Sequence, residues 1–418
     1  MNIIKTFKGI FKKTNSYTWG DSFTYNGYTC TITDFNEEYI KNFIVSTIIE
    51  RLSTDIASLE INEELLPKEN RFWEIIKNPN QYQTWYDFMK ELNSWFEIDG
   101  VVFVYQVLND DGKTLNSIYV LPKKDVKIIG DAGTGDIISY EIKQKQGNYI
   151  TVKNYNERLN DPRNTVFMIK DFNSNSRYAC DLPPSKLESV CNQLEYISLA
   201  NRYSNNFLKK GAKPSVAIKV ESKDGFRGKL SDTQKAELKA AFIANYVGSE
   251  NAGSPIILEE GVDLKTISTD IDKLNFDEGI ENSIVSACMR YFVPLEVIGY
   301  AKNTSGGQYK VSDDTRKFYM NNAVLPRAKN IYAKLNQNFM FRYGKNELSF
   351  DVAKIPTLMA ERFSLLESME RSKTFTINER RQYANKEQLD GLDVIMVGLN
   401  EADARQSREK EPIDNNAI

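Results

Sequence analysis

The residues best suited to catalysis are five acidic side chains that lie close together in the second half of the chain. They are Asp270, Asp272, Asp277, Glu278 and Glu281. Carboxylates alone can bind Mg²⁺, so such a cluster would suit a metal-dependent nuclease or another phosphate-handling enzyme. However, Asp270 and Asp272 do not share one face of a helix, and acidic residues at a helix start also stabilise its dipole. We keep the carboxylate-metal nuclease as an alternative and predict no metal site.

Other kinds of catalysis have little support in the sequence. The 418 residues include no histidine, which excludes Ser-His-Asp and Cys-His catalysis and removes the commonest metal ligand. The glycines between Gly130 and Gly135 lack the lysine–serine ending and the following helix of a phosphate-binding loop, so we expect a hairpin turn there. The sequence therefore predicts a protein that is not an enzyme and needs no cofactor.

The cysteines are interpreted as thiols. There are four, at Cys30, Cys180, Cys191 and Cys288, and no two are spaced as a CxxC pair. This scatter is typical of buried or free thiols in a reducing compartment, not of a zinc site or a disulfide framework.

Charge and hydropathy narrow the class of protein. Lysine and arginine number 54 and acidic residues 57, for a formal net charge of −3, so a monomeric DNA-binding module with a broad basic face is not favoured. Apolar residues make up 41% of the chain, and no apolar run approaches the roughly 18 residues that would span a bilayer. We expect a globular protein of two or three domains without a membrane partner.

The first residues combine apolar and basic side chains at helical spacing. The apolar members are Ile3, Ile4, Phe7, Ile10 and Phe11, and the basic members are Lys5, Lys8, Lys12 and Lys13. Such a segment could lie on a membrane surface. We favour an arm that docks on a neighbouring subunit.

The elements that would position functional residues follow in order. Apolar spacing predicts a helix from Glu37 to Leu59, and Thr84 with Asp87 predicts the start of another. From Gly100 onward, apolar residues recur with a period of two residues, which is typical of strands. Strands are expected at 101–108, 118–121, 125–129, 137–143, 149–153 and 165–169, with turns between them.

A small α/β module is expected between two long helices. Ser185 and Glu188 form a capping box that opens the first helix, which ends at Lys209-Lys210-Gly211. Strands at 216–220, 255–258 and 262–267 and a helix from Ser231 to Tyr246 form the module. The second long helix is expected at 270–292. Such an insertion on a helical pair suggests a stalk with a tip.

A polar loop follows the second long helix. Pro294 ends that helix, and Gly299 to Gly307 is nearly without apolar residues. A longer helix begins near Val311, with a stripe predicted at Thr315, Phe318, Asn322, Leu325, Tyr332, Leu335 and Phe339. Pro326 lies inside it and should kink it, because its ring removes a hydrogen bond.

Motifs in order along the chain resemble those of portal proteins, the head-to-tail connectors of tailed bacteriophages. They are Asn78-Pro79-Asn80 with Trp85-Tyr86-Asp87-Phe88, the strand Gly100–Tyr105, Leu121-Pro122 before Val126, Phe207 through Lys213-Pro214, Leu258–Gly261, Tyr291–Pro294 with Ile298-Gly299, Leu325-Pro326, and Thr376–Arg380. Each is weak alone, but their order and spacing extend the resemblance over nearly the whole length. Gly306-Gly307-Gln308-Tyr309 departs from the family's usual loop.

The resemblance implies an α+β portal fold with named regions. The wing would comprise 1–184 and return in 311–371, which includes the long helix. Stem helices would occupy 185–211 and 269–293, with the clip at 212–268. The tunnel loop would be 294–310 and the C-terminal crown or tail 372–418. Copies, usually twelve, would form a ring at one capsid vertex through which DNA is packaged, retained and ejected.

The resemblance also implies sites and partners. Lys302, Asn303, Thr304, Ser305, Gly306 and Gly307 would face DNA in the channel, and Lys209, Lys210, Lys213 and Lys219 would serve clip and partner docking. Implied partners are the terminase large subunit, a head-tail adaptor, the major capsid and scaffold proteins, and double-stranded DNA without sequence specificity. The protein would reside in the virion, and in the host cytoplasm during assembly.

Overall fold

The computed structural model describes most of the chain. The described residues are 24–25, 28–29, 32, 34–63, 71–109, 115–131, 134–153, 165–174, 176, 178–209, 216–220, 231–246, 262–266, 276–300, 311–343, 348–372, 374–384 and 386–395. The helices are α1 (Phe35–Lys41), α2 (Phe43–Ala57), α3 (Arg71–Lys77), α4 (Trp85–Asp99), α5 (Cys191–Lys209), α6 (Asp232–Tyr246), α7 (Phe276–Tyr291), α8 (Asp313–Tyr319), α9 (Leu325–Tyr343), α10 (Pro356–Arg371) and α11 (Ile377–Tyr383).

The strands form antiparallel sheets. They are β1 (Thr24–Tyr25), β2 (Tyr28–Thr29), β3 (Val101–Leu108), β4 (Leu115–Leu121), β5 (Val126–Gly130), β6 (Ile137–Lys143), β7 (Tyr149–Lys153), β8 (Thr165–Lys170), β9 (Val216–Val220) and β10 (Val262–Thr266). Two three-stranded sheets have the orders β4-β3-β8 and β5-β6-β7, and β1-β2 and β9-β10 form separate pairs. The predicted α+β class is confirmed, and the predicted strands that lie among the described residues agree with the structure to within a few residues.

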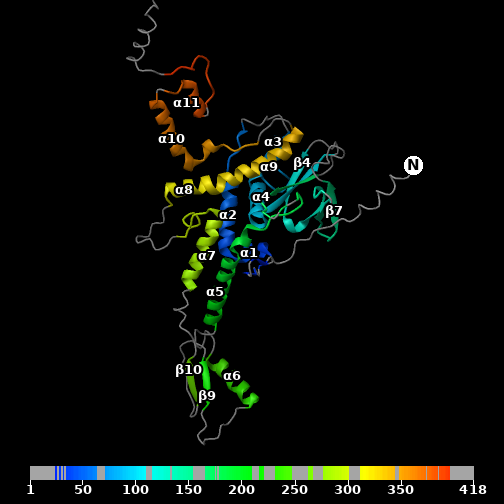
Figure 1. The fold of residues 1–418 in the computed structure, drawn as a ribbon, viewed down its shortest axis with the longest axis vertical. Coiled ribbons are helices and arrows are strands. Elements are labelled where there is room, and N and C mark those ends of the chain that lie inside the picture. The colour runs from blue at the N-terminus through cyan, green and yellow to red at the C-terminus, as the bar shows by residue number, and fades with distance from the viewer. Residues whose placement is uncertain are drawn as a thin grey trace, which may run out of the picture.

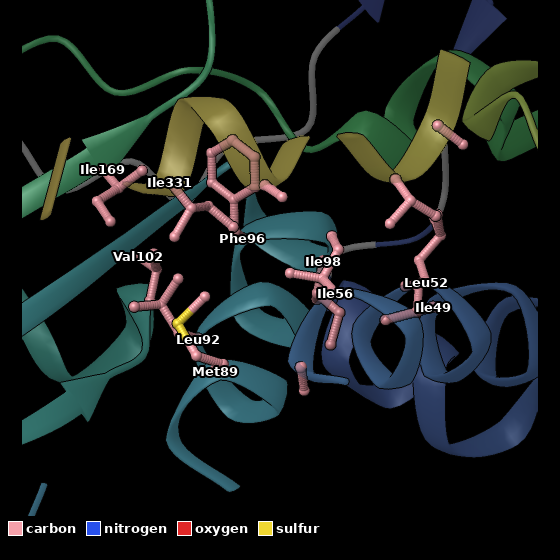
Figure 2. Close-up of a cluster of buried hydrophobic side chains, with 14 of the residues drawn as sticks. Ile49, Leu52, Ile56, Met89, Leu92, Phe96, Ile98, Val102, Ile169 and Ile331 are labelled. Atoms are coloured by element: carbon pink, nitrogen blue, oxygen red, sulfur yellow. The ribbon is translucent and has the colours of Figure 1, made fainter. Parts of the chain in front are cut away.

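The molecule is elongated, and its largest core lies where α2 and α4 meet the β4-β3-β8 sheet (Figure 1). Figure 2 shows the buried side chains that α2, α4, β3, β8 and α9 contribute to one apolar cluster, among them Leu52, Phe96, Val102 and Ile331. Each of those four is at most 2% exposed. Burying such side chains contributes about 1.5–3 kcal/mol apiece, so this cluster is the rigid base on which the other elements rest.

The prediction of a single helix from Glu37 to Leu59 is wrong, because the structure divides this stretch at Asn42 into α1 and α2. Asn42 has extended backbone angles, ends α1 and caps α2, where its side chain accepts a hydrogen bond from the N–H of Ile44. The break turns two residues of the predicted buried face outward: Ile40 is 71% exposed and Phe43 is 60% exposed. Asparagine favours such caps because its short side chain competes for backbone hydrogen bonds.

Two capping boxes lie where the sequence predicts them. Thr84 and Asp87 form the box that opens α4. Ser185 and Glu188 form a second box, but it opens a 3-10 segment, Lys186–Val190, that leads into α5. Both patterns are local in sequence, which explains why they could be recognised without the fold.

Helices α5 and α7 lie side by side and lead from the core to the β9-β10 pair and α6 (Figure 1). Gly279 of α7 has no room for a side chain, since an added Cβ would lie 2.1 Å from the Tyr196 hydroxyl of α5. Tyr203 contacts Phe276 with ring centroids 5.3 Å apart. The predicted helical pair is therefore closely packed. The strand predicted at 255–258 lies outside the described residues.

The long helix after the loop contains a π segment. Met320–Val324 forms π turns between α8 and α9, directly before Pro326. A π turn adds a residue to the helical repeat and shifts the side-chain phase. The predicted stripe is therefore wrong before the segment, where Tyr319 is buried while Phe318 is 50% exposed. It holds after the segment, where Leu325, Tyr332 and Leu335 are buried.

The thiol interpretation is wrong for one cysteine. Cys191 is disulfide-bonded, whereas Cys180 and Cys288 are free. Spacing along the chain does not reveal which cysteines meet in space, so the sequence did not indicate the bond. Across the part of the chain that the structure describes, no helix combines the length and the apolar character needed to cross a bilayer.

Candidate functional site

The loop between α7 and α8 is the candidate site, and the structure shows how both of its ends are anchored. The six residues expected to face a channel, Lys302 to Gly307, lie outside the described residues. The upstream flank to Tyr300 and the downstream flank from Val311 are described. Gly299 has a φ of +83°, a conformation that glycine adopts without the steric cost of a side chain.

The upstream anchor is a Schellman motif at the end of α7. Phe292 N–H donates to the carbonyl of Met289 at 3.2 Å, and Val293 N–H donates to the carbonyl of Cys288 at 3.0 Å. Val293 is 2% exposed, so the chain leaves the helix pinned to the core. Phe292 occupies the position that usually holds glycine, with a φ of +56°, and is 52% exposed. Among the described residues it is the one non-glycine residue with positive φ.

Replacing Phe292 with glycine should stabilise the protein. A side chain in the left-handed region costs about 1–2 kcal/mol, and this one recovers little by burial. We expect Phe292→Gly to raise the free energy of unfolding by about 1 kcal/mol, as measured by chemical denaturation. Phe292→Ala is the matched control, because it removes the ring but keeps the strain. An equal gain from both variants would assign the effect to the exposed ring.

The downstream anchor is the cap of α8. Ser312 accepts a hydrogen bond from the N–H of Thr315 at 3.1 Å, and Asp313 and Asp314 occupy the acidic first turn. Ser312 thereby pairs an N–H group of the first turn, and the two aspartates place negative charge at the positive end of the helix dipole. The π segment that follows is bonded to α9, where Arg327 Nη1 donates to the Ala323 carbonyl at 2.9 Å.

Residues close to both anchors, Tyr291 at the end of α7 and Arg327 at the start of α9, contact the buried Glu97 of α4. Its Oε1 accepts from Lys186 Nζ at 2.9 Å and from Arg327 Nε at 2.9 Å. Tyr291 Oη donates to the backbone carbonyl of Glu97 at 3.1 Å. We call Glu97, Lys186, Arg327 and Tyr291 the Glu97 hub. It connects α4, the segment before α5, the end of α7 and the start of α9.

Two opposed effects act on the pKa of Glu97. Burial raises it, because the charged carboxylate loses its hydration, while Lys186 and Arg327 lower it. The two cations prevail, and the pKa lies below its ordinary value of 4.5. Lys186 also lies 3.5 Å from Asp171 and above the Phe96 ring at 4.2 Å. Glu97 is therefore ionised at neutral pH. Its two ion pairs join α4 to the segment before α5 and to α9, and the Tyr291 hydrogen bond joins α7.

Asp99 is a partly buried acid with the opposite shift, and its replacement should change the pH dependence of stability. Burial raises its pKa from 3.8 to about 6, although Lys123 lowers it in part. The folded protein therefore binds the proton more tightly than the unfolded chain, and stability falls as pH rises from about 4 to 6. We expect Asp99→Asn to raise the free energy of unfolding at pH 8 by about 2–3 kcal/mol and to have little effect at pH 4. Denaturation at both values checks this. A gain that does not depend on pH would contradict it.

The lysines predicted for partner docking are not brought together in the described residues. Lys209 is exposed at the end of α5, where a lysine stabilises the helix dipole. Lys219 lies on β9 opposite Asp263 of β10. Lys210 and Lys213 lie outside the described residues.

The structure describes only part of the acidic cluster. Asp277 and Glu278 occupy the first turn of α7, as helix-start acids do. Asp270 and Asp272 lie outside the described residues. Where the structure is described, three or more potential metal ligands nowhere gather to hold an ion.

Comparison with known families decides the class of protein. A family model described as phage portal protein matches residues 44–385. The chain belongs to the phage portal protein family. Portal proteins are structural, non-enzymatic components of phage capsids, so the family membership decides against the enzyme alternative.

Relatives and solved structures agree with the family. Uncharacterized proteins of Rickettsia bellii and Rickettsia felis are each 22% identical, over 74% and 78% of this chain and 76% and 78% of their own lengths. The neck of an empty gene transfer agent (GTA) particle superposes with a TM-score of 0.64 and 19% identity, covering 93% of this chain and 99% of that one. An HK97 family phage portal protein from Corynebacterium diphtheriae has a TM-score of 0.54 and 14% identity, covering 77% and 97%. These likenesses show an α+β portal fold.

Sequence reasoning missed the Glu97 hub. One signal was present: Glu97 follows Phe96 on α4, within the helix face of Leu92 and Asn93, where an apolar residue is expected. A charge on a buried helix face needs a partner. The partners lie 89 and 230 residues away along the chain, and nothing in the sequence marks them.

Proposed function

We propose that this member of the family assembles into a ring at one capsid vertex of a phage or phage-derived particle and forms the channel for double-stranded DNA. In this proposal DNA is packaged, retained and later ejected through the channel without sequence specificity. The observation that carries the proposal is the family match over 44–385. The channel segment is the α7–α8 loop, with α5 and α7 as the stem.

The subunit number and partners belong to the same proposal. The neck of a native GTA particle computed with C12 symmetry resembles this chain with a TM-score of 0.61 and 19% identity, covering 85% of this chain and 93% of that one. That likeness supports a twelve-membered ring. The terminase large subunit, a head-tail adaptor, and the major capsid and scaffold proteins are the proposed partners. The β9-β10 pair and α6 would form the clip.

Assembly is the test of this function. Ring closure needs heterologous contacts, in which one surface of a copy meets a different surface of the next. We expect native mass spectrometry of the purified chain to show a closed oligomer near twelve subunits, and negative-stain images to show annular particles. A monodisperse monomer at micromolar concentration, at low and high salt, would overturn the proposal.

A further inference from the structure

A groove with an acidic lining runs between α1 and α5. It has a volume of about 300 Å³ and is lined by Asp34, Glu37 and Glu38 beside α1 and by Glu195, Leu199 and Arg202 on α5. Lys41 also lines it and pairs with Glu37. Four carboxylates thus face two cations. The groove suits a positively charged occupant.

The same region exposes apolar side chains. Two apolar residues, Ile32 and Leu199, line the groove, and Leu199 is 53% exposed. Helix α1 has no fully buried residue, although Phe35, Tyr39 and Ile40 make up almost half of it. The surface therefore offers apolar area as well as negative charge. Its occupant should combine apolar and basic residues.

One stretch of this chain has that composition. Residues 1–20 contain Lys5, Lys8, Lys12 and Lys13 and no acidic residue. The apolar residues of the same stretch are Ile3, Ile4, Phe7, Ile10 and Phe11, at spacings that place them on one face of a helix. The remainder of the chain, taken alone, is acidic, because the whole carries −3. Charge and apolar pattern both match the groove. We call residues 3–13 the basic arm.

The basic arm has enough chain behind it to reach another copy. Twenty residues separate Lys13 from Asp34. Within them Thr24 pairs with Thr29, so the β1-β2 hairpin returns the chain close to where it entered. The remaining fourteen residues span at most roughly 45 Å when extended. That reach exceeds the length of α5, about 30 Å for its nineteen residues.

We propose that the basic arm of one copy docks in the α1–α5 groove of the neighbouring copy. This inference rests on the proposed ring and deepens it. A ring closed by heterologous contacts needs one donor and one acceptor surface on each copy. Each chain carries one basic arm and one groove, so every groove in a closed ring is filled and no arm is left over. Lysines meet carboxylates at the rim while the isoleucines and phenylalanines cover Leu199 and Ile32.

Cysteine cross-linking tests the docking and its direction. Lys8→Cys and Ser198→Cys are combined in one chain in which Cys180 is changed to serine, since Cys180 is a free, partly exposed thiol. Ser198 lines the groove. Under oxidation, the proposal expects a ladder of covalent oligomers on non-reducing gels. Lys8→Cys with Ser364→Cys on exposed α10 is the control and should give no ladder.

Charge reversal tests the chemistry. In the cross-linking protein, changing the three remaining arm lysines, Lys5, Lys12 and Lys13, to glutamate should reduce cross-linking about tenfold, and adding Glu37→Lys with Glu195→Lys should restore part of it. A cross-link confined to monomers would overturn the neighbouring-copy assignment. Intact rings without any cross-link would overturn the docking alone, whereas absence of rings would overturn the proposed function. Arm-dependent binding to anionic vesicles by uncross-linked rings would assign the arm to a membrane surface and also overturn the docking.

Discussion

Replacing Glu97 with alanine is expected to destabilise the protein by about 3–5 kcal/mol, because it leaves Lys186 and Arg327 without their shared partner. The Lys186 and Arg327 side chains are 7% and 12% exposed, so water cannot replace the lost carboxylate. An unpaired buried charge costs far more than the pair itself contributes. The loss should appear in the free energy of unfolding and in the soluble yield.

Matched variants separate the charge effect from general disruption. Glu50→Ala removes an exposed partner of Lys90, an ion pair at 3.2 Å whose side chains are 35% and 60% exposed, and should cost less than about 1 kcal/mol. Replacing Glu97, Lys186 and Arg327 together with methionine should recover part of the Glu97→Ala loss, since no buried charge is then unpaired. A Glu97→Ala loss no larger than that of Glu50→Ala would show that the Glu97 hub does not hold the fold.

The hub also predicts how stability responds to acid. The folded-state pKa of Glu97 lies below the unfolded value of 4.5, so its contribution is complete above that value. The contribution is lost as pH falls from 4.5 through the folded-state pKa. Asp99, with its pKa raised to about 6, acts in the opposite sense at higher pH. The two acids together favour greatest stability in mildly acidic conditions.

Elements whose signals are local could be predicted from the sequence. Thr84 and Asp87 lie three residues apart and form their capping box as expected. Strands β6 and β7 begin and end at the predicted residues, because alternating apolar residues and flanking turns are also short-range patterns. The family motifs indicated a portal protein, and the match over 44–385 confirms that family.

Features that depend on tertiary structure could not be predicted in this way. The π segment before Pro326 rotates the buried face of α8 onto Tyr319, and apolar spacing cannot show where a helix gains a residue. The Cys191 disulfide and the Glu97 hub each depend on partners that the fold brings together. For the candidate site, the sequence located the loop, and the structure added how the Phe292 turn and the Ser312 cap hold its ends.

Deleting Ala301 to Gly306 is expected to leave rings intact but to impair DNA packaging or retention. Both loop ends are fixed outside the deleted segment, by the Schellman motif at Phe292 and by the cap of α8, so the fold does not depend on it. Lys302 is the only charge in the segment. In a channel it would meet DNA phosphates one at a time, through contacts that are weak singly and screened by salt.

The measurement is the fraction of DNA-filled heads when each variant complements particles that lack the portal protein. A six-residue Gly-Ser replacement of the same length keeps the span between α7 and α8 and removes Lys302, and Lys302→Ala removes only the charge. If the loop contacts DNA along its whole length, the fraction of filled heads should fall least for Lys302→Ala, further for the Gly-Ser replacement and most for the deletion. Full-length genomes packaged by the deletion variant would exclude the loop from the mechanism. If the deletion variant fails to form rings while the equal-length replacement forms them, the loop is instead a structural spacer, because only its length then matters.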